Sequence, residues 1–313
     1  MTTPTHVPVM CDEILTLLAP ALDRPGAVLV DATLGLGGHT AAALARFPQL
    51  RVIGIDRDPQ ALGLARARLG ELAGRFTAVE ATYDSLPDVV DAPVDAILFD
   101  LGLSSLQIDS PERGFSYAQD APLSMRMDGD DAALTAADVV NTYSAADLAR
   151  IFRAYGDEPH ARRIADAIVA ARGTTPFTTS ARLVAVITAA VPPQPARGGH
   201  PAKRVFQAVR MEVNDERAGL ERALPAALAA LRVGGRLAVL SYHSGEDRIV
   251  KQLFAAVCQD QAPPGVPVVP ERYQAQFTPV TRGALGASPA EVQANPRAQS
   301  ARLRVVERCK EGV

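Results

Sequence analysis

Short apolar runs alternate with longer amphipathic segments in the first third of the chain. The runs at 27–30, 52–55 and 96–99 have the length and composition of strands that are buried on both faces. An alanine-rich helical pattern at 40–46 separates the first two runs, and a second helical pattern, PQALGLARARLGEL, begins at residue 59. Because strands that alternate with helices build a parallel sheet, this pattern predicts an α/β fold.

The same pattern returns only at the segment LRVGGRLAVLSYHS, which starts at residue 231. Its two glycines are expected to end a helix, and a strand is expected at 236–241. A crossover between parallel strands needs only about a dozen residues, so a further structure must be inserted before this point. Within that stretch, amphipathic segments predict helices that begin near residues 144, 160 and 178. We therefore predict a helical insert at 110–213.

The remaining pattern completes the sheet. One helix is predicted from Lys203 through to the next strand, with a bend at Pro225. Residues 260–299 are rich in Pro and Gly, which predicts a long loop with one strand near Phe277, and the segment ARLRVVER predicts the last strand. The sheet-forming domain is thus expected to consist of residues 1–109 and 214–313.

Composition narrows the class of protein. With 313 residues, of which 48% are hydrophobic and 21% charged, the chain is long enough to bury one large core or two smaller ones. No apolar stretch approaches the roughly 18 residues of a membrane span, and the N-terminal residues lack the regions of a signal peptide. We expect a cytoplasmic protein without a membrane partner. Cys11, Cys258 and Cys309 form no CxxC pair, which argues against a disulfide framework and a metal site.

Candidate chemistry gathers where the predicted strands end. Gly35, Gly37 and Gly38 lie between the first strand and the helix after it, where glycines let backbone N–H groups approach a ligand. A tight turn that binds nothing would have the same sequence. Asp56 ends the second run, 21 residues after Gly35, the spacing of an acid that meets ribose hydroxyls. Since Asp100 ends a further run, the site is predicted at the carboxyl ends of the strands.

Two cofactor classes fit these residues: a nicotinamide dinucleotide and S-adenosylmethionine. The dinucleotide motif G-x-G-x-x-G is met at its first two glycines, Gly35 and Gly37, but its last glycine is absent, so spacing alone does not decide. Asp31, four residues before Gly35, would place a carboxylate near an ammonium group, which a methionine moiety has and a pyrophosphate lacks. The residues favour the methyl donor, and a nicotinamide-dependent oxidoreductase stays open as an alternative.

The chain resembles bacterial 16S ribosomal RNA cytosine-N4 methyltransferases (RsmH, also called MraW) over residues 6–304. The stretches that carry the resemblance are HVPVMCDEIL, DATLGLGGHT, IDRDPQAL, DLGLSSLQID, RGFSY, MRMD, HPAKRVFQAVRMEVN, GGRLAVLSYHSGEDRIVK and NPRAQSARLR. The resemblance implies a Rossmann-like class I methyltransferase sheet with an inserted helical domain. It also implies S-adenosylmethionine as donor, and a cytosine in the decoding region of 16S rRNA, within the small ribosomal subunit, as acceptor. A donor-binding assembly factor without turnover is the second alternative, and a homodimer is left open.

Carried onto this chain, the resemblance implies a set of donor contacts. They are Gly37, Gly38 and His39 in the turn, Asp56 at the ribose, Tyr83 beside the adenine, and Asp100 and Gln107 near the reactive end of the donor. Two positions depart from the family pattern. Tyr83 stands where phenylalanine is common, and either ring can stack. Ser124, in PLSMRMD, stands where an acid is expected, which leaves the role of that loop open.

The expected chemistry is the methylation of an amino group. The lone pair of the cytosine amino nitrogen is delocalised into the ring, so catalysis must place that nitrogen in line with the methyl group and accept its hydrogen. We hypothesise that Asp100 or a nearby backbone carbonyl accepts the hydrogen, and that Ser104 and Ser105 shape the base pocket. His243 is a candidate contact to the base, although a lone histidine is more often structural.

RNA must be held by a local patch, because a net charge of −3 gives no general attraction to nucleic acid. The helical insert is the expected RNA-recognition domain, and its target base must be unstacked or single-stranded. The candidate contacts are basic residues, although a solvated charged face would have the same pattern. They are Lys203, Arg204, Arg210, Arg297, Arg302 and Arg304.

Overall fold

The chain divides into two compact units. A computed structural model describes residues 8–72, 74–128, 133–192, 200–262 and 269–311. The first unit, here called the sheet unit, comprises Met1–Gly102 and Ala218–Val313, and the second, the helical unit, comprises Leu103–Arg217. The helical unit is wider at both ends than the predicted 110–213. Leu103 packs against its core, and Glu216 binds Arg210 within it, which explains both extensions.

The sheet unit contains a seven-stranded sheet in the order β3-β2-β1-β4-β5-β7-β6. Strands β1 to β5 pair in parallel, whereas β7 is antiparallel to both β5 and β6. The predicted α/β fold is confirmed, and the strand order reverses at β1, which brings the carboxyl ends of β2, β1 and β4 side by side. The strands are β1 (Val28–Asp31), β2 (Arg51–Asp56), β3 (Phe76–Glu80), β4 (Val94–Asp100), β5 (Leu231–Ser241), β6 (Phe277–Pro279) and β7 (Arg302–Arg308).

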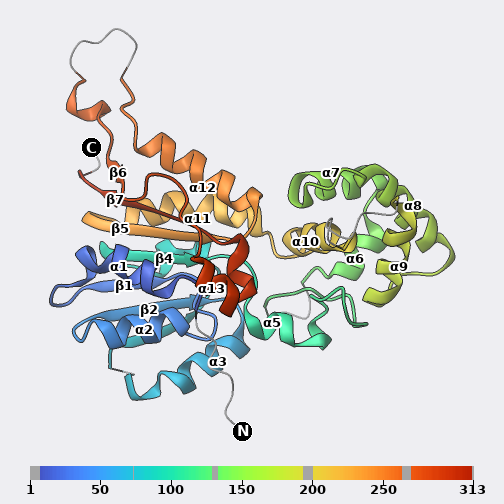
Figure 1. Cartoon of the computed structure of the whole chain (residues 1–313), viewed down its shortest axis with the longest axis horizontal. Coiled ribbons are helices and arrows are strands. Elements are labelled where there is room, and N and C mark those ends of the chain that lie inside the picture. Colours follow the sequence, from blue (N-terminus) through green and yellow to red (C-terminus); the bar gives the residue numbers. More distant parts are fainter. Residues whose placement is uncertain (1–7, 73, 129–132, 193–199, 263–268, 312–313) are drawn as a thin grey trace. The chain divides into compact units, whose positions relative to one another are not determined.

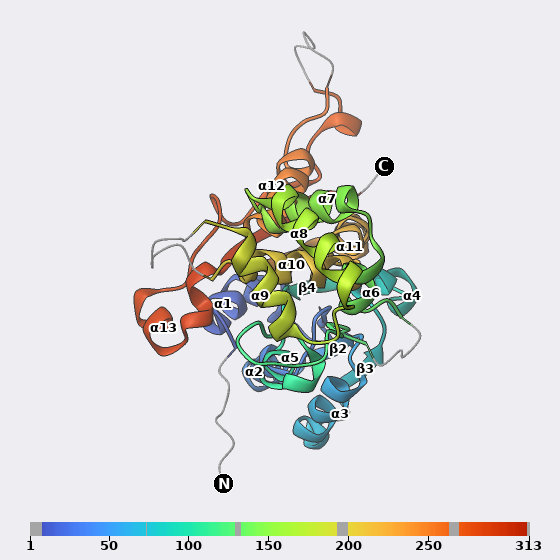
Figure 2. The same cartoon turned by 90° about the vertical axis from the view of Figure 1, so that its right-hand side faces the viewer.

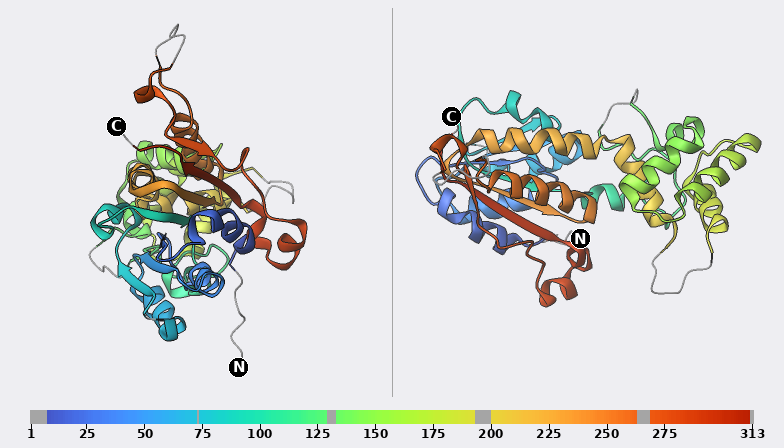
Figure 3. Two further views of the ribbon diagram at one scale, coloured as in Figure 1. Left: turned by 90° about the vertical axis from the view of Figure 1, so that its left-hand side faces the viewer. Right: turned by 90° about the horizontal axis from the view of Figure 1, so that it is seen from above.

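Helices cover both faces of this sheet (Figures 1 and 3). Successive side chains of a strand point to opposite faces, and β4 shows the consequence. Its Leu98 packs in one apolar cluster with α1 and α2, whereas its Phe99 packs in another with α11 and α12. The helices of this unit are α1 (Cys11–Leu22), α2 (Gly38–Arg46), α3 (Pro59–Arg68), α4 (Leu86–Val89), α11 (Glu216–Ala230, whose first two residues belong to the helical unit), α12 (Ser244–Val257) and α13 (Pro289–Ala294). In the part of the chain with described placement, no helix combines the length and hydropathy that a bilayer crossing needs.

Two predicted boundaries were wrong. The single helix expected after Lys203 is two helices, because Asp215 adopts a left-handed conformation with φ of 49° and ends the run, whereas Pro225 lies inside α11. The glycines expected to end a helix lie within β5 instead. The pairing of β4 with β5 shifts register between Val94 and Ala96, and Gly234, with φ of 80°, supplies the backbone turn that this irregularity needs.

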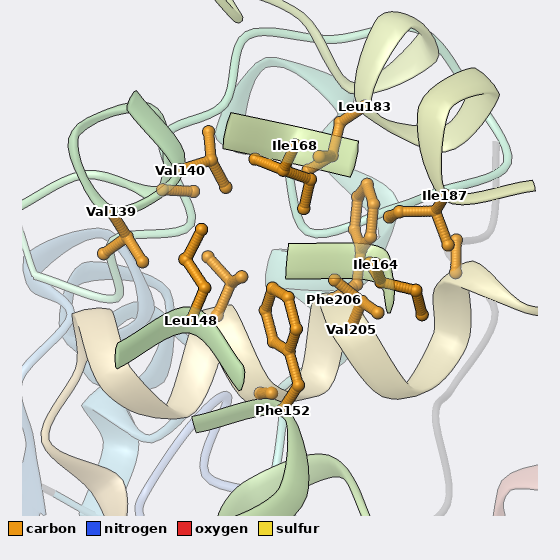
Figure 4. Close-up of a cluster of buried hydrophobic side chains, with 14 of the residues drawn as sticks. Val139, Val140, Leu148, Phe152, Ile164, Ile168, Leu183, Ile187, Val205 and Phe206 are labelled. Atoms are coloured by element: carbon orange, nitrogen blue, oxygen red, sulfur yellow. The ribbon is translucent and has the colours of Figure 1, made fainter. Parts of the chain in front are cut away.

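The helical unit has its own core. α10 contacts α6, α7 and α9, and α8 packs against α7 (Figure 2). Figure 4 shows apolar side chains of these five helices converging on one interior. The predicted start of α7 is confirmed, since the side chain of Ser144 accepts a hydrogen bond from the amide of Asp147. The helices are α5 (Ser105–Asp109), α6 (Ala136–Thr142), α7 (Ala145–Gly156), α8 (Ala161–Thr174), α9 (Ser180–Ala190) and α10 (Ala202–Val213).

Asn214, at the junction of α10 and α11, holds the loop that carries Ser124. Its side chain is 4% exposed, accepts a hydrogen bond from the amide of Met127 (2.9 Å) and donates one to the carbonyl of Met125 (2.7 Å). Met125 is itself in the left-handed region, with φ of 55°. The loop is therefore positioned by a buried amide rather than by an acidic side chain at Ser124.

Replacing Asn214 with alanine is expected to lower the unfolding free energy of the helical unit by about 3 kcal/mol, because two buried backbone groups lose their partner. Urea denaturation followed by circular dichroism measures the change. Asn295→Ala is the control, since the Asn295 side chain accepts a hydrogen bond from the exposed amide of Arg297, and the loss of such a cap costs about 1 kcal/mol. Equal losses for the two variants would show that Asn214 does not hold the loop.

Candidate functional site

Three carboxylates end neighbouring strands of the sheet unit. Asp31 ends β1, Asp56 ends β2 and Asp100 ends β4. β1 lies between the other two strands, and Asp31 pairs in register with Gly54 of β2 and Leu98 of β4. The three acids therefore meet at one edge of the sheet, as the apolar runs predicted. The glycine turn that follows β1 lies at the same edge.

The glycine turn is shaped by close packing. Gly37 precedes α2 with φ of 71°, a conformation that residues with a Cβ rarely adopt. A Cβ on Gly38 would lie 2.6 Å from Cγ of Pro8, and one on Gly37 would lie 3.0 Å from Cδ1 of Leu69. Both glycines are thus required by the fold itself, in addition to any approach of a ligand.

Asp56 is oriented by the backbone. Its Oδ2 accepts a hydrogen bond from the amide of Gly35 (2.7 Å), and its Oδ1 accepts one from the amide of Asp58 (2.9 Å). Burial raises the pKa of Asp56 to about 6, although these two hydrogen bonds lower it. Each carboxylate oxygen keeps a second lone pair for a hydroxyl donor. The group therefore suits the ribose contact that the sequence predicted.

Asp31 supports the turn from below. Its side chain is 1% exposed, and its carboxylate accepts hydrogen bonds from the hydroxyl of Thr40 (2.7 Å) and the amide of Thr33 (3.3 Å). Burial raises the pKa of Asp31 above the usual value of a carboxyl group. Because the carboxylate is buried and held by the chain, its role in this structure is to fix the start of α2. The sequence predicted this carboxylate near a ligand ammonium, and in the structure its hydrogen bonds go to Thr33 and Thr40 instead.

Asp100 lies in a cluster with His39 and Tyr242. The Tyr242 hydroxyl donates a hydrogen bond to Oδ1 of Asp100 (2.8 Å), and Nδ1 of His39 lies 3.5 Å from Oδ2. His39, in the first turn of α2, is 6% exposed, and its Nε2 lies 3.1 Å from the carbonyl oxygen of Val9. The side chain of Asp100 is 25% exposed, so this carboxylate is reachable from outside. Burial raises the pKa of Asp100, whereas His39 and the Tyr242 hydrogen bond lower it.

Sequence reasoning missed Tyr242, although a signal was present. Tyr242 directly follows β5, and β5 pairs in register with β4, so that Leu240 faces Asp100. A prediction of which strand lies beside β4 would have placed Tyr242 next to the end of that strand. The apolar pattern predicts that a strand exists but not its neighbours, which is why the contact was not foreseen.

His243 caps α12. Its Nδ1 accepts a hydrogen bond from the amide of Glu246 (3.3 Å), and the Glu246 side chain accepts hydrogen bonds from the amides of His243 and Tyr242. The side chains of His243 and Glu246 thus form largely a helix cap. The Nε2 atom of His243 lies 3.1 Å from Oε1 of Glu246, but within the described ranges it has no partner of hydrogen-bond geometry. It stays a candidate contact for a base.

Ser104 and Gln107 belong to the helical unit. They form a capping box at the start of α5: Oγ of Ser104 accepts from the amide of Gln107 (3.3 Å), and Oε1 of Gln107 accepts from the amide of Ser104 (3.0 Å). The spacing S-x-x-Q could have predicted this cap. Ser105 is the first residue of α5, and its side chain lies outside the described part of the structure.

Tyr83 is held by packing within the sheet unit. It lies in the short 3-10 helix η2 (Tyr83–Ser85), and its ring meets Phe99 edge to face, with the ring centroids 5.9 Å apart. A Cβ on Gly219 would lie 3.2 Å from the ring, so Gly219 makes room for it. The ring is thus held against Phe99, the residue that precedes Asp100.

The basic candidates separate into two groups. Lys203 and Arg204 are exposed on α10, and Arg297 and Arg302 are exposed in the sheet unit. Two others are held by carboxylates with two hydrogen bonds each. Arg210, 12% exposed, binds Glu216 at 2.7 Å across the junction of α10 and α11, and Arg304, 15% exposed, binds Asp247 at 2.7 and 3.1 Å. We therefore remove Arg210 and Arg304 from the candidate RNA contacts.

Comparison with known proteins identifies the family. The sequence model of the MraW methylase family matches residues 3–309. A ribosomal RNA small subunit methyltransferase H from Nocardioides sp. is 59% identical over 319 residues, with 100% of this chain and 99% of that protein covered. The protein of the same name from Streptomyces avermitilis is 55% identical, with 98% of each chain covered. The chain belongs to the MraW methylase family.

Proposed function

We propose that the protein transfers a methyl group from S-adenosylmethionine to the exocyclic N4 of a cytosine in the decoding region of 16S rRNA, in the small ribosomal subunit. The observation that carries this proposal is the family match over residues 3–309. Membership of a methylase family favours a methyl donor over a nicotinamide dinucleotide, and the curated relatives are named as methyltransferases rather than as assembly factors. Because the proposed substrate is the rRNA of the small ribosomal subunit, we assign the reaction to the cytoplasm.

The carboxyl edge of the sheet fits the donor. Asp56, oriented by two backbone amides, receives the ribose hydroxyls. Gly37, Gly38 and His39 form the start of α2 beside it, and the ring of Tyr83 is held in place for the adenine. Gln107, whose side-chain oxygen caps α5, is assigned to the reactive end of the donor together with Asp100. When bound, the donor supplies a methyl group on a positively charged sulfur.

Asp100 is the proposed acceptor of the amino hydrogen. The N4 lone pair becomes localised as it attacks the methyl group, so the N–H bonds become more acidic and a nearby carboxylate stabilises the developing charge. The side chain of Asp100 is held by Tyr242 on one oxygen and faces His39 with the other, while a quarter of it stays exposed. His243, Ser104 and Ser105 are proposed to contact the base.

Transfer of labelled methyl groups tests the proposal. We expect small subunits that lack the modification to accept the label at one cytosine, and mass spectrometry of small-subunit RNA from cells with and without the protein to place the methyl group on N4. Naked 16S rRNA is tested in parallel, which shows whether free RNA is a substrate or whether the assembled small subunit is needed. Absence of transfer to both, or tighter equilibrium binding of NAD than of S-adenosylmethionine, would contradict the assignment.

Lys203 and Arg204 are proposed to bind RNA phosphates from the exposed side of α10. Reversing both charges (Lys203→Glu with Arg204→Glu) is expected to weaken RNA binding by at least about tenfold at moderate salt, because both phosphate contacts are lost. Each such contact contributes about 0.7 to 0.9 to the slope of log binding constant against log salt concentration. The affinity for the donor should change less than twofold. Fluorescence anisotropy with an rRNA fragment and calorimetry with the donor measure the two.

The matched control is Arg162→Glu with Arg163→Glu, a second pair of adjacent, exposed basic residues in the same unit, on α8. If this pair weakens RNA binding as much as the α10 pair, the effect comes from net charge and α10 is not the contact. If the α10 pair loses donor and RNA binding equally, the variant is misfolded.

A further inference from the structure

We propose that Tyr242 is a positioning residue for Asp100: the Tyr242 hydroxyl keeps the Asp100 carboxylate ionised and oriented to take the amino proton. The inference rests on the proposed role of Asp100 in methyl transfer. Tyr242 and Asp100 are 142 residues apart in the sequence, yet the Tyr242 hydroxyl donates a hydrogen bond of 2.8 Å to Oδ1 of Asp100. The parallel pairing of β4 with β5 brings them together, since Leu240 lies in register with Asp100.

The phenol ring of Tyr242 is held on several sides. Its amide donates a hydrogen bond to Oε2 of Glu246 (2.9 Å), which ties the residue to the start of α12. A Cβ on Gly102 would lie 3.3 Å from the ring, and the ring packs against the apolar cluster that contains Met10 and Leu240. The constrained ring fixes the position of its hydroxyl oxygen, which lies within hydrogen-bond distance of Oδ1 of Asp100.

The other oxygen of Asp100 faces His39. The carbonyl of Val9 can only accept a hydrogen bond, so the Nε2 atom of His39 donates to it at 3.1 Å. Nδ1 is turned towards Oδ2 of Asp100, and it favours the charge of that carboxylate when it also carries a hydrogen. The backbone is held as well, because the amide of Asp100 donates to Oγ1 of Thr33 (2.6 Å). Rotation of the carboxylate would exchange its two oxygens, and the Tyr242 hydrogen bond opposes that rotation.

Ionisable groups face Asp100 from the elements packed around it. Asp31 on β1 and Glu246 on α12 disfavour its charge, whereas His39 on α2 and the Tyr242 hydroxyl favour it. Burial also raises the pKa of Asp100. In the reaction N4 gains the methyl group as the bond from sulfur to that methyl breaks, and N4 loses one proton to Asp100, which later releases it to solvent. The carboxylate must start in the ionised form, which is the form that Tyr242 stabilises.

Tyr242→Phe removes the hydroxyl and keeps the ring. In full-length protein labelled with ¹³C at aspartate carboxyl carbons, an NMR titration without ligand should show the pKa of Asp100 rising by about one unit, the equivalent of a tenfold change in its proton affinity. Asp100→Asn assigns the resonance. In methyl-transfer assays, the acid limb of kcat/KM should move to higher pH by the same amount. The rate on the alkaline plateau, where Asp100 is fully ionised, should fall much less than the rate on the acid limb, since only the orientation of the carboxylate is lost there.

The matched control is Tyr143→Phe, which removes a hydroxyl that is hydrogen-bonded to Glu212 in the helical unit. It should move neither the Asp100 titration nor the acid limb. The proposal is overturned if the pKa of Asp100 is the same in Tyr242→Phe as in wild type, or if activity falls equally at every pH, as a purely structural role predicts. If wild-type protein transfers no methyl group, the proposed function fails, and the ligand-free titration still decides whether Tyr242 controls Asp100.

Discussion

Asp100→Asn lowers kcat for methyl transfer by about 100-fold or more, the range in which a positioned general base contributes to a rate. Asparagine has nearly the same shape, and its carbonyl oxygen can still accept the hydrogen bond that Tyr242 now donates to Oδ1. It carries no charge and takes up no proton at neutral pH. The change therefore removes the chemistry of the carboxylate and keeps its packing.

Single-turnover kinetics with saturating donor separate the chemical step from donor binding in this variant. Asp166→Asn is the control, since it makes the same substitution in an exposed ion pair with Arg162 on α8. That variant should retain wild-type kcat. If Asp100→Asn keeps both turnover and donor affinity, Asp100 is not the proton acceptor, and a backbone carbonyl takes that role.

Gly114→Ala lowers the stability of the helical unit by more than about 4 kcal/mol, a loss that only severe packing or backbone conflicts produce. Gly114 has φ of 75°, and a Cβ at this position would lie 2.0 Å from the carbonyl oxygen of Pro122 and 3.1 Å from the amide nitrogen of Ser124. Both atoms belong to the backbone, so no side chain can move aside. The segment RGFSY thus meets the loop before α6 at a point where only glycine fits.

Gly173→Ala is the matched control in the same unit. Gly173 lies inside α8, where an added Cβ would meet no atom of the described residues within 4 Å, apart from those of its own helix. Alanine there should raise stability by up to about 1 kcal/mol through helix propensity. Denaturant unfolding and limited proteolysis of the two variants measure the difference. A loss below about 1 kcal/mol for Gly114→Ala would mean that the loop can move away, unlike most well-packed backbone contacts.

The candidate site was predictable where its residues end regular elements. The apolar runs before Asp56 and Asp100 ended within a residue of the observed strands, because burial of both faces of a parallel sheet leaves a local signature. The turn between β1 and α2 was predictable for the same reason. The break after α10 was not, because Pro225 is the stronger local signal, yet Asp215 in its left-handed conformation ends the run.

The sequence did not show which basic side chains are held in ion pairs. Lys203 and Arg210 lie seven residues apart on one helix and were both candidate RNA contacts, but Arg210 is turned to Glu216 beyond the end of α10. Arg304 on β7 likewise meets Asp247 on α12. Whether a guanidinium group is available for a phosphate depends on the carboxylates that the fold brings to it, which spacing along one helix does not show.

The sequence by itself determined which segments become strands and helices, which acids end the strands, and, through its motifs, the family and the expected methyl-transfer chemistry. Only the tertiary structure decided which side chains meet: Tyr242 with Asp100, His39 between Val9 and Asp100, and Asn214 with the loop at 125–127. The reason is physical. Periodicity and strand ends are local properties of the chain, whereas strand order and helix packing join residues that are far apart, and the hydrogen bonds that orient a reactive carboxylate depend on those long-range contacts.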